Sequence, residues 1–366
     1  MDFAFSDEQQ MLRDSARGFL AERSPLERVI ELAQFDEGWD RRVYAEMAGL
    51  GWTGLSVPED AGGSGMGFLE EAVLFEELGY ALYPGPFFST VGLALPLLQG
   101  SDLARSVAAG EARATVAWAE PGSAANLTDP GEPSTKAEAS NGSWTLSGEK
   151  TLVPDLAAAD VVAVVAGSAE GTGVWAVAAG GDGVEVSGLS TMDTTRRLGR
   201  LRLDGAPARE LVAPGEAAQA LDRLRLRAFA ALGLEAVGVA RRALELAQEH
   251  AVQRQQFGKP IGAYQAVSHK VSDVYMETEL ARSLAYWAAW CVEVDDDNAG
   301  RAALSAKFYA AEAAVRSCER AIQVHGGIGF TWEHVLHRLY KRAQWIESFE
   351  GFGAVHRAEV AASLLG

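Results

Sequence analysis

The sequence predicts an α+β chain of three consecutive parts: an N-terminal helical domain over residues 1–113, a central antiparallel β-domain over 114–214, and a C-terminal four-helix-bundle domain over 215–366. Three observations predict this order. In the first part, apolar residues recur at helical spacing. The middle part consists of short runs rich in Val, Thr and Trp, separated by Gly, Pro, Asn and Asp. After Gly215 the chain is rich in Ala, Leu, Arg and Glu with almost no Pro, which favours long helices.

In the first part, the segment DEQQMLRDSARGFLAER carries one apolar stripe, and Ser6 or Asp7 is available to cap its start. The stripe consists of Met11, Leu12, Ala16, Phe19 and Leu20. Further along, Pro58 and the glycines from Gly62 to Gly67 predict a loop before the next helix, FLEEAVLFEELGYAL.

The middle part predicts seven short strands, and the last part predicts three long helices. The strands are expected at residues 114–119, 134–139, 143–148, 159–166, 173–179, 183–188 and 197–205. The helices are expected at Leu224–Arg254, Tyr264–Val294 and Arg301–His325, and their lengths suit a bundle.

Composition limits the class of protein. The chain has 366 residues and 48% hydrophobic content, enough to bury a substantial core. A formal charge of −18 repels phosphate backbones, which argues against nucleic acid as the main partner. Cys291 and Cys318 are too few for a disulfide framework and lack the spacing of a metal site. The N-terminus has no apolar signal core and no run approaches the roughly 18 apolar residues of a membrane span, so we expect a cytoplasmic protein.

Two motifs in the last third carry a resemblance to a known family. The segment AVQRQQFGKPIGAYQAVSHKVSD resembles the R-x-x-F-G…Q segment of the acyl-CoA dehydrogenases, which are FAD-dependent oxidoreductases. The segment AIQVHGGIGFTWEHVLHRLYKRA resembles their Q-x-x-G-G-x-G-[FY] segment. With LGWTGLSVPEDAGGSGMG in the first third and AEPG at the start of the β-domain, the resemblance covers essentially the whole chain.

The resemblance implies FAD as the cofactor and assigns residues to it. In relatives, the two motifs reach across a subunit interface to the ADP half of a neighbour's FAD. A pyrophosphate needs a guanidinium or backbone N–H groups, and glycine lets the backbone approach it. Each motif also has a purely structural interpretation. RQQFG could be a helix end with an exposed Arg, and HGGIG could be a simple break between two helices. The residues carried over are Arg254, Phe257, Gln323, Gly326 and Gly327, with Gln265 a weaker candidate.

The resemblance also implies a catalytic base. Desaturation of an acyl thioester removes a proton beside the carbonyl while a hydride leaves the next carbon, and a carboxylate in a dry pocket can take that proton. In many relatives it is the Glu of a [YF]-E-G-[TS] turn, and QWIESFEGFGAVHR places Glu350 at that spacing. The alternative for Glu350 is a surface acid before a turn. In other members the base lies on the helix that opens the last domain, where Glu235 is the fallback; a buried Glu paired with an Arg is an equally fair interpretation.

The chain departs from the family at the flavin ring. Relatives show T-E-P-x-A-G-S-D and K-x-[WY]-I-[TS]-[NG], whereas this chain has AEPGSAANLTD and EKTLVPD. Ala119 and Pro154 replace two hydroxyl residues, Leu152 replaces the aromatic residue, and Phe352 replaces the Thr or Ser after the base. Pro offers neither a hydroxyl nor an N–H. This pattern resembles the smaller subunits of heteromeric acyl-CoA dehydrogenases.

Three functions therefore remain. The first is FAD-dependent dehydrogenation of an acyl-CoA to a trans-2-enoyl-CoA, with electrons passed to an electron-transfer flavoprotein or a similar acceptor. The second is a catalytically weak partner subunit that completes a companion's FAD site, and the third is an acyl-CoA oxidase. Because relatives split the cofactor site between subunits, we expect a homo- or hetero-oligomer, either a dimer or a tetramer.

Overall fold

The computed structural model describes residues 5–122, 127, 131–140 and 142–365. The chain forms two compact units, each assembled from separate stretches of sequence. The helical unit comprises Met1–Gln34, Phe68–Tyr83 and Phe229–Gly366, and the sheet unit comprises Phe35–Gly67 and Pro84–Ala228. Helix α7 (Ala217–Gln253) begins in the sheet unit and continues into the helical unit. The three consecutive domains expected from the sequence stay a prediction.

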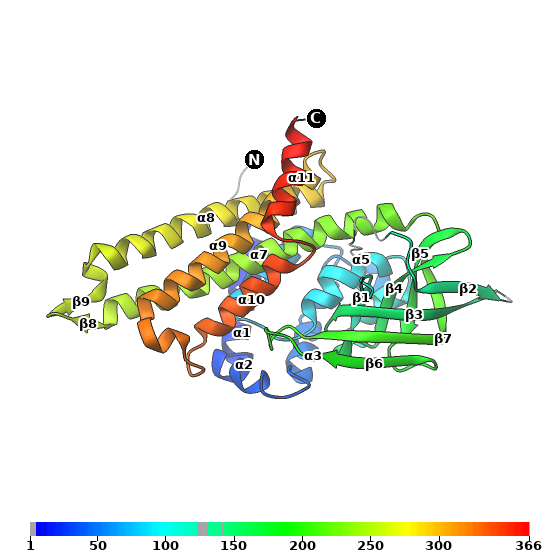
Figure 1. Cartoon of the computed structure of the whole chain (residues 1–366), viewed down its shortest axis with the longest axis horizontal. Coiled ribbons are helices and arrows are strands. Elements are labelled where there is room, and N and C mark those ends of the chain that lie inside the picture. Colours follow the sequence, from blue (N-terminus) through cyan, green and yellow to red (C-terminus); the bar gives the residue numbers. More distant parts are fainter. Residues whose placement is uncertain (1–4, 123–126, 128–130, 141, 366) are drawn as a thin grey trace. The chain divides into compact units, whose positions relative to one another are not determined.

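The helical unit carries the long helices that the sequence predicts, drawn from light green (α7) through yellow to red in Figure 1, and the N-terminal helices in blue. Besides most of α7, its helices are α1 (Asp7–Arg23), α2 (Leu26–Leu32), α4 (Phe68–Tyr80), α8 (Gln265–Glu293), α9 (Ala299–His325), α10 (Leu336–Ser348) and α11 (Gly353–Leu365). Its short elements are β8 (Gln255–Gln256), β9 (Lys259–Pro260), η5 (Ile261–Ala263) and η6 (Gly326–Phe330).

The sheet unit holds the strands and several short helices. The strands are β1 (Ala114–Ala117), β2 (Lys136–Ser140), β3 (Ser143–Pro154), β4 (Val161–Ser168), β5 (Gly171–Ala178), β6 (Val184–Leu189) and β7 (Leu198–Val212). The helical segments are α3 (Arg41–Gly49), η1 (Trp52–Gly54), η2 (Glu59–Ala61), the π-helical η3 (Phe88–Ala94), α5 (Leu95–Leu98), α6 (Asp102–Ala108) and η4 (Leu156–Ala158).

The sheet closes on itself, because β4 pairs with β5 along one edge and with β1 and then β2 along the other. The order β1-β4-β2-β3-β7-β5 completes the ring, with β6 added against β7. The sequence predicted an antiparallel domain, and most neighbours are antiparallel, but β1 runs parallel to β4 from Ala114↔Val161 onward. Trp175 and Leu201 are fully buried in the core that the strands enclose. Closure leaves few open strand edges.

Helix α1 begins where the sequence predicts. Ser6 Oγ accepts a hydrogen bond from the Gln9 backbone N–H, and the Gln9 side chain accepts one from the Ser6 N–H, both at 3.2 Å. This capping box satisfies two N–H groups that the start of a helix leaves without intrahelical partners. The stripe behind it buries Ala16 and Leu20.

Helices α4 and α7 cross at two glycines. A Cβ on Gly79 would overlap the carbonyl oxygen of Glu235, and a Cβ on Gly238 would overlap that of Glu76. Only residues without a side chain allow backbones to approach so closely. The buried Glu76 carboxylate accepts a hydrogen bond from Tyr286 Oη at 2.7 Å. The close approach at the two glycines holds the segment of α7 that contains Glu235 directly against α4.

In the part of the chain that the structure describes, no helix combines the length and the apolar content needed to cross a bilayer.

Candidate functional site

The motif RQQFG forms the end of α7 and a tight hairpin. The Arg254 N–H donates to the His250 carbonyl at 2.9 Å, and β8 then pairs with β9 around the two residues Phe257 and Gly258. Both have positive φ, 52° and 81°, as a two-residue type I′ turn requires. A Phe with positive φ is unusual, and its side chain is 91% exposed. The hairpin therefore presents an aromatic ring at its tip.

Arg254 is also presented to the outside. Its side chain is exposed, and within the described ranges this side chain forms neither a hydrogen bond nor an ion pair. Gln265, the first residue of α8, is exposed beyond the hairpin. Tyr264 supports the hairpin, with Lys259 Nζ 4.2 Å from its ring centroid and Phe257 edge-on to it at 6.5 Å.

The second motif lies where α9 ends. Gly326 caps the helix with φ 66° and ψ −140°, a conformation that is almost restricted to glycine. A Cβ on Gly326 or Gly327 would meet no atom within 4 Å, so the space beside this backbone is open. The Gln323 side chain is exposed one turn earlier. This arrangement fits the close backbone approach for which the sequence nominated the glycine pair.

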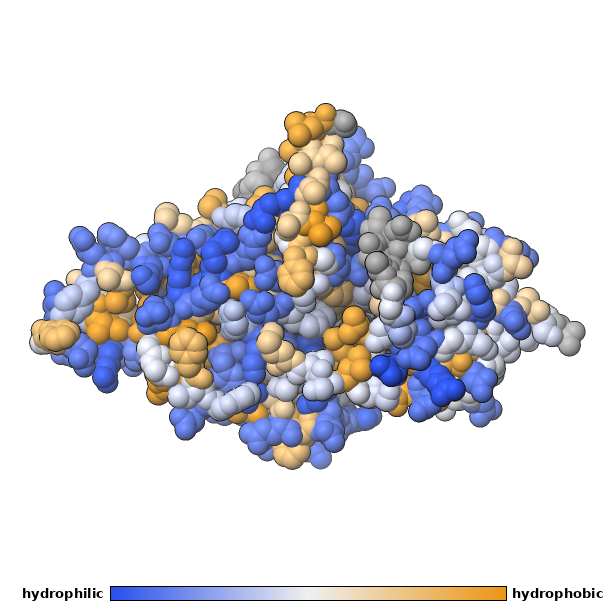
Figure 2. Space-filling view, viewed as in Figure 1, coloured by the Kyte–Doolittle hydropathy of each residue, from blue (hydrophilic) through white to orange (hydrophobic). Residues whose placement is uncertain are grey.

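Two histidines bring the motifs together. The rings of His250 on α7 and His325 on α9 stack with centroids 4.3 Å apart, and His334 lies 4.6 Å from His325. Figure 1 shows β8, β9 and the ends of α7 and α9 at one end of the helical unit, and Figure 2 shows exposed apolar side chains over the same end. Burial lowers the pKa of His250, and the charges of His325 and Arg254 lower it further. Sequence reasoning missed the stack because its members lie 75 residues apart.

Glu350 lies in the turn between α10 and α11. Helix α10 separates this turn from η6, and its length is about 20 Å. Its side chain is half-buried. Glu350 has φ 55° and Gly351 has φ 108°, so the turn uses left-handed backbone at both positions. The following Phe352 is 58% exposed. Arg357, the later Arg of the family pattern, forms an ion pair with Glu312 of α9.

Side chains from two neighbouring helices hold this turn. The buried Lys307 Nζ on α9 donates to the Glu347 carbonyl at 2.8 Å and to the Gly351 carbonyl at 2.7 Å. His356 on α11 is also buried, and its Nε2 lies 3.1 Å from the Glu350 carbonyl oxygen. No local pattern singles out either residue, since a lone Lys or His on a helix is ordinary.

Glu235 lies elsewhere, in the interior of α7. It is 2% exposed, and its Oε1 accepts a hydrogen bond from Arg342 Nη1 on α10 at 2.6 Å. Arg342 Nη1 and Nη2 also lie 3.4 Å from the Tyr83 carbonyl oxygen. To accept a proton from a substrate, Glu235 would have to give up a buried ion pair. The geometry therefore favours the structural interpretation of Glu235.

The sheet unit brings the two flavin-ring motifs side by side. The Thr151 N–H donates to the Ala119 carbonyl at 2.9 Å. Leu152 has φ 55° and is 54% exposed, while the Pro154 carbonyl accepts a hydrogen bond from Thr115 Oγ1 at 2.6 Å. The segment AEPGSAANLTD continues into residues 123–126 and 128–130, which lie outside the described residues. Leu152, which stands where the resemblance expects an aromatic residue, therefore has an exposed side chain on left-handed backbone.

A buried ion pair joins the same two motifs. Glu120 Oε1 and Lys150 Nζ lie 2.7 Å apart, and Glu120 also accepts hydrogen bonds from Ser134 and from the Thr135 N–H. Burial alone would raise the pKa of Glu120, but the hydrogen bonds from Lys150, Ser134 and Thr135 lower it to about 2. Burial lowers the pKa of Lys150, and Glu120 raises it in part. The Glu of AEPG is therefore structural.

The residues at the two helix-end motifs suit FAD better than those around Ala119 and Pro154. The Arg254 guanidinium and the open backbone at Gly326 and Gly327 suit a pyrophosphate. Ala119 and Pro154, which the resemblance places at the flavin ring, have no side-chain hydroxyl, so these two side chains offer a flavin no polar contact.

The helix–sheet–helix order and the closed sheet define the fold class of the chain. Family models for the acyl-CoA dehydrogenase N-terminal domain and C-terminal domain match residues 6–102 and 217–365. The chain belongs to the acyl-CoA dehydrogenase family.

Individual relatives match over nearly the whole chain. The acyl-CoA dehydrogenase IpdE2 of Mycobacterium tuberculosis is 31% identical over 92% of this chain and 91% of its own. The ChsE4–ChsE5 complex from Mycobacterium tuberculosis includes a chain with 29% identity and a TM-score of 0.87, covering 100% and 99% of the two chains. An acyl-CoA dehydrogenase complexed with FAD from Bacillus anthracis has 26% identity and a TM-score of 0.90, covering 99% of this chain and 68% of its own.

Proposed function

We propose that the chain takes part in the FAD-dependent α,β-dehydrogenation of an acyl-CoA thioester to a trans-2-enoyl-CoA, with Glu350 as the base. Membership of the acyl-CoA dehydrogenase family supports the reaction class. The observation that best supports Glu350 as the base is its left-handed backbone conformation. Left-handed backbone costs a residue with a side chain about 1–2 kcal/mol, yet the turn keeps a Glu at φ 55°. Strain of this kind concentrates at functional sites.

In this proposal, the Glu350 carboxylate takes the proton from the carbon beside the thioester carbonyl. When bound, the flavin accepts the hydride that leaves the adjacent carbon, and the electrons then pass to an electron-transfer flavoprotein or a similar acceptor. Lys307 and His356 hold the backbone on both sides of the base.

The ADP half of FAD is assigned to the two helix-end motifs. Arg254 binds the pyrophosphate through charge-assisted hydrogen bonds, and Gly326 and Gly327 allow the phosphates to approach the backbone. Phe257 and the exposed amides Gln265 and Gln323 provide further contacts around it.

An oligomer completes the site. Arg254, Phe257, Gln323, Gly326 and Gly327 are exposed at one end of the helical unit, so they suit contact with a cofactor held by another subunit. Tyr275, Met276 and Leu280 on α8 are each more than half exposed. Apolar side chains gathered on one helix favour helix-on-helix association.

A second candidate function is that of a catalytically weak partner subunit, which lends Arg254 and Gly327 to a companion's FAD. It is favoured by Ala119 and Pro154 at the ring motifs and by the exposed, left-handed Leu152. The ChsE4–ChsE5 complex shows that a relative exists in a complex of two named proteins.

The substitution Glu350→Gln tests the first candidate. The chain is purified alone and co-expressed with its genomic neighbour, and flavin content is read from the absorbance near 450 nm. Glu350→Gln keeps the size of the side chain but cannot abstract a proton, so flavin should stay bound while acyl-CoA-dependent bleaching falls by at least about 100- to 10,000-fold.

The matched control is Glu347→Gln, which changes a neighbouring acid three residues earlier and should leave bleaching intact. Full bleaching in Glu350→Gln would reject Glu350 as the base. If, in addition, the wild-type chain binds flavin only with its neighbour, the partner-subunit function is the better account.

A further inference from the structure

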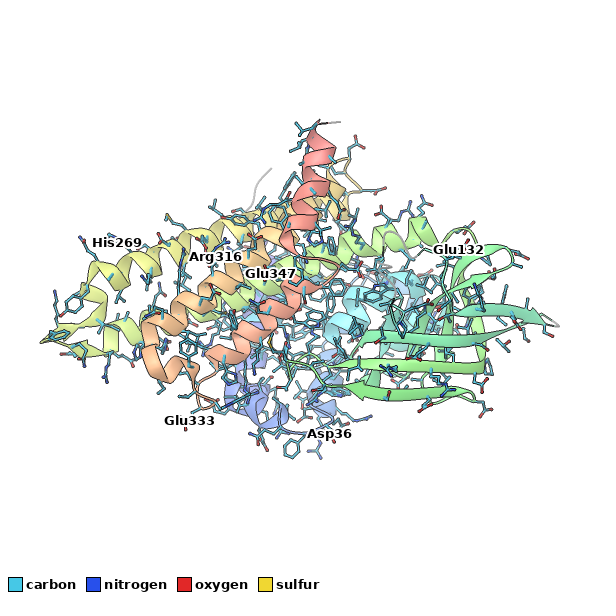
Figure 3. The ribbon with its side chains drawn as sticks, viewed as in Figure 1. Asp36, Glu132, His269, Arg316, Glu333 and Glu347 are labelled. Carbon is cyan, nitrogen blue, oxygen red and sulfur yellow. The ribbon has the colours of Figure 1, made fainter. Side chains whose placement is uncertain are left out.

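Lys307 is a buried cation placed against backbone rather than at the surface. It lies in the middle of α9, its side chain is fully buried, and its ammonium group donates to the carbonyl oxygens of Glu347 and Gly351. Glu347 lies one residue before the end of α10, and Gly351 lies two residues before the start of α11, so one ammonium group spans the turn that carries Glu350. Figure 3 labels Glu347 at the end of α10 near Arg316 of α9.

Physical chemistry explains what the contact does. The last carbonyl groups of a helix have no intrahelical partner, and a cation at the helix C-terminus is favourable. Hydrogen bonds from an ammonium group are stronger than neutral ones. Burying an ammonium is nevertheless expensive, and an apolar side chain of similar length would fill the same space without that penalty. Lys307 is therefore placed for its hydrogen bonds rather than for its volume.

A second side chain clamps the same turn. His356 Nε2 donates to the Glu350 carbonyl oxygen at 3.1 Å, because a carbonyl can only accept. The Phe229 ring supports both groups, edge-on to His356 at 5.1 Å and 5.7 Å from Lys307 Nζ. Three carbonyl groups within five residues thus accept hydrogen bonds from α9 and α11. A strained turn persists only where several surrounding contacts hold it, and these three hydrogen bonds are such contacts.

We propose that Lys307 is a positioning residue: it holds the 347–351 turn in the left-handed conformation that directs the Glu350 carboxylate at its substrate. The inference rests on the proposed role of Glu350. Lys307 touches no substrate, and its effect passes through the backbone of the turn.

The first test measures the turn itself and needs no activity. In the full chain, Lys307→Met removes the ammonium and keeps an unbranched apolar side chain. Amide hydrogen exchange read by mass spectrometry should rise in peptides covering residues 347–353 and stay unchanged in β3 and β7, which serve as the internal control. Unchanged exchange in the turn overturns the proposal.

The second test measures catalysis in the complete flavin-loaded complex. Lys307→Met should lower kcat about 100-fold, as a displacement of a catalytic group by about 1 Å does, with flavin content and KM for acyl-CoA preserved. In a Glu350→Asp background, where the carboxylate is already displaced, the further loss should be at most about threefold. An undiminished kcat, or an equal loss in both backgrounds, overturns the proposal.

A second variant covers the case in which Lys307→Met does not fold. Lys307→Gln keeps one N–H donor without burying a charge, so its exchange in the turn and its kcat should lie between those of the wild type and those expected for Met. If Lys307→Gln folds and matches the wild type in both, the proposal is wrong. The proposed function fails separately, through full bleaching in Glu350→Gln, and the exchange experiment still reports on Lys307 in that case.

Discussion

Glu235 on α7 and Arg342 on α10 form an ion pair inside the helical unit, with 2.6 Å between Oε1 and Nη1 and side chains that are 3% and 1% exposed. The pair joins the helix that runs through both units to the helix that ends at the Glu350 turn. Because Glu235 is buried and paired with a cation, the geometry favours a structural role for it, and Glu350 stays the predicted base.

The pair predicts a stability effect for Glu235→Gln. Removing one charge leaves Arg342 buried without its carboxylate, which typically costs about 3–5 kcal/mol in the free energy of unfolding. Urea unfolding should show this loss, and the folded variant should still bleach with acyl-CoA. Adding Arg342→Met should recover part of the stability. Loss of bleaching with unchanged stability would instead make Glu235 the base.

Arg254→Ala tests the pyrophosphate assignment. A charge-assisted hydrogen bond contributes about 1.5–3 kcal/mol, so flavin affinity should weaken about 10- to 100-fold. Circular dichroism should show unchanged helix content, because the side chain is exposed. Arg223→Ala is the matched control: Arg223 is an exposed Arg on the same helix, and its replacement should leave the 450 nm absorbance unchanged. Wild-type flavin affinity in Arg254→Ala would exclude the assignment.

The Glu120–Lys150 pair predicts acid sensitivity of the sheet unit. The folded-state pKa of Glu120, about 2, lies below its ordinary value of 4.5. A lowered carboxylate pKa adds stability that is present above the ordinary value and is lost as pH falls from there toward the folded-state pKa. Unfolding titrations of the wild type from neutral pH to about pH 3 should therefore show stability falling below about pH 4.5.

Lys150→Met is the informative comparison for this acid effect. It should lower stability at neutral pH, because Glu120 then lies buried without its cation, and it should flatten the dependence on pH. An acid profile identical to that of the wild type would show that other carboxylates govern the loss.

Local patterns in the sequence are enough to predict the helices and strands. Helical spacing and the composition after Gly215 predicted the long helices, and short runs rich in Val, Thr and Trp between turn residues located the strands of the sheet unit. These features are local, because they depend on side chains a few positions apart on one helix face or strand. The family resemblance likewise followed from short motifs, and the family models confirm it. The roles of Arg254, Phe257, Gln265, Gln323 and Glu350 stay predictions.

Which distant residues come into contact depends on the packing of the whole chain. The pairing of Glu235 with Arg342, the stack of His250 on His325 and the contact of Lys307 with the Glu350 turn join positions that are 40 to 107 residues apart. The parallel pairing of β1 with β4 is of the same kind. No local pattern encodes such contacts, because each depends on how whole helices and strands pack. Lys307, an ordinary lysine within an Ala-rich helix by sequence, donates hydrogen bonds to the Glu350 turn only because α9 packs against that turn.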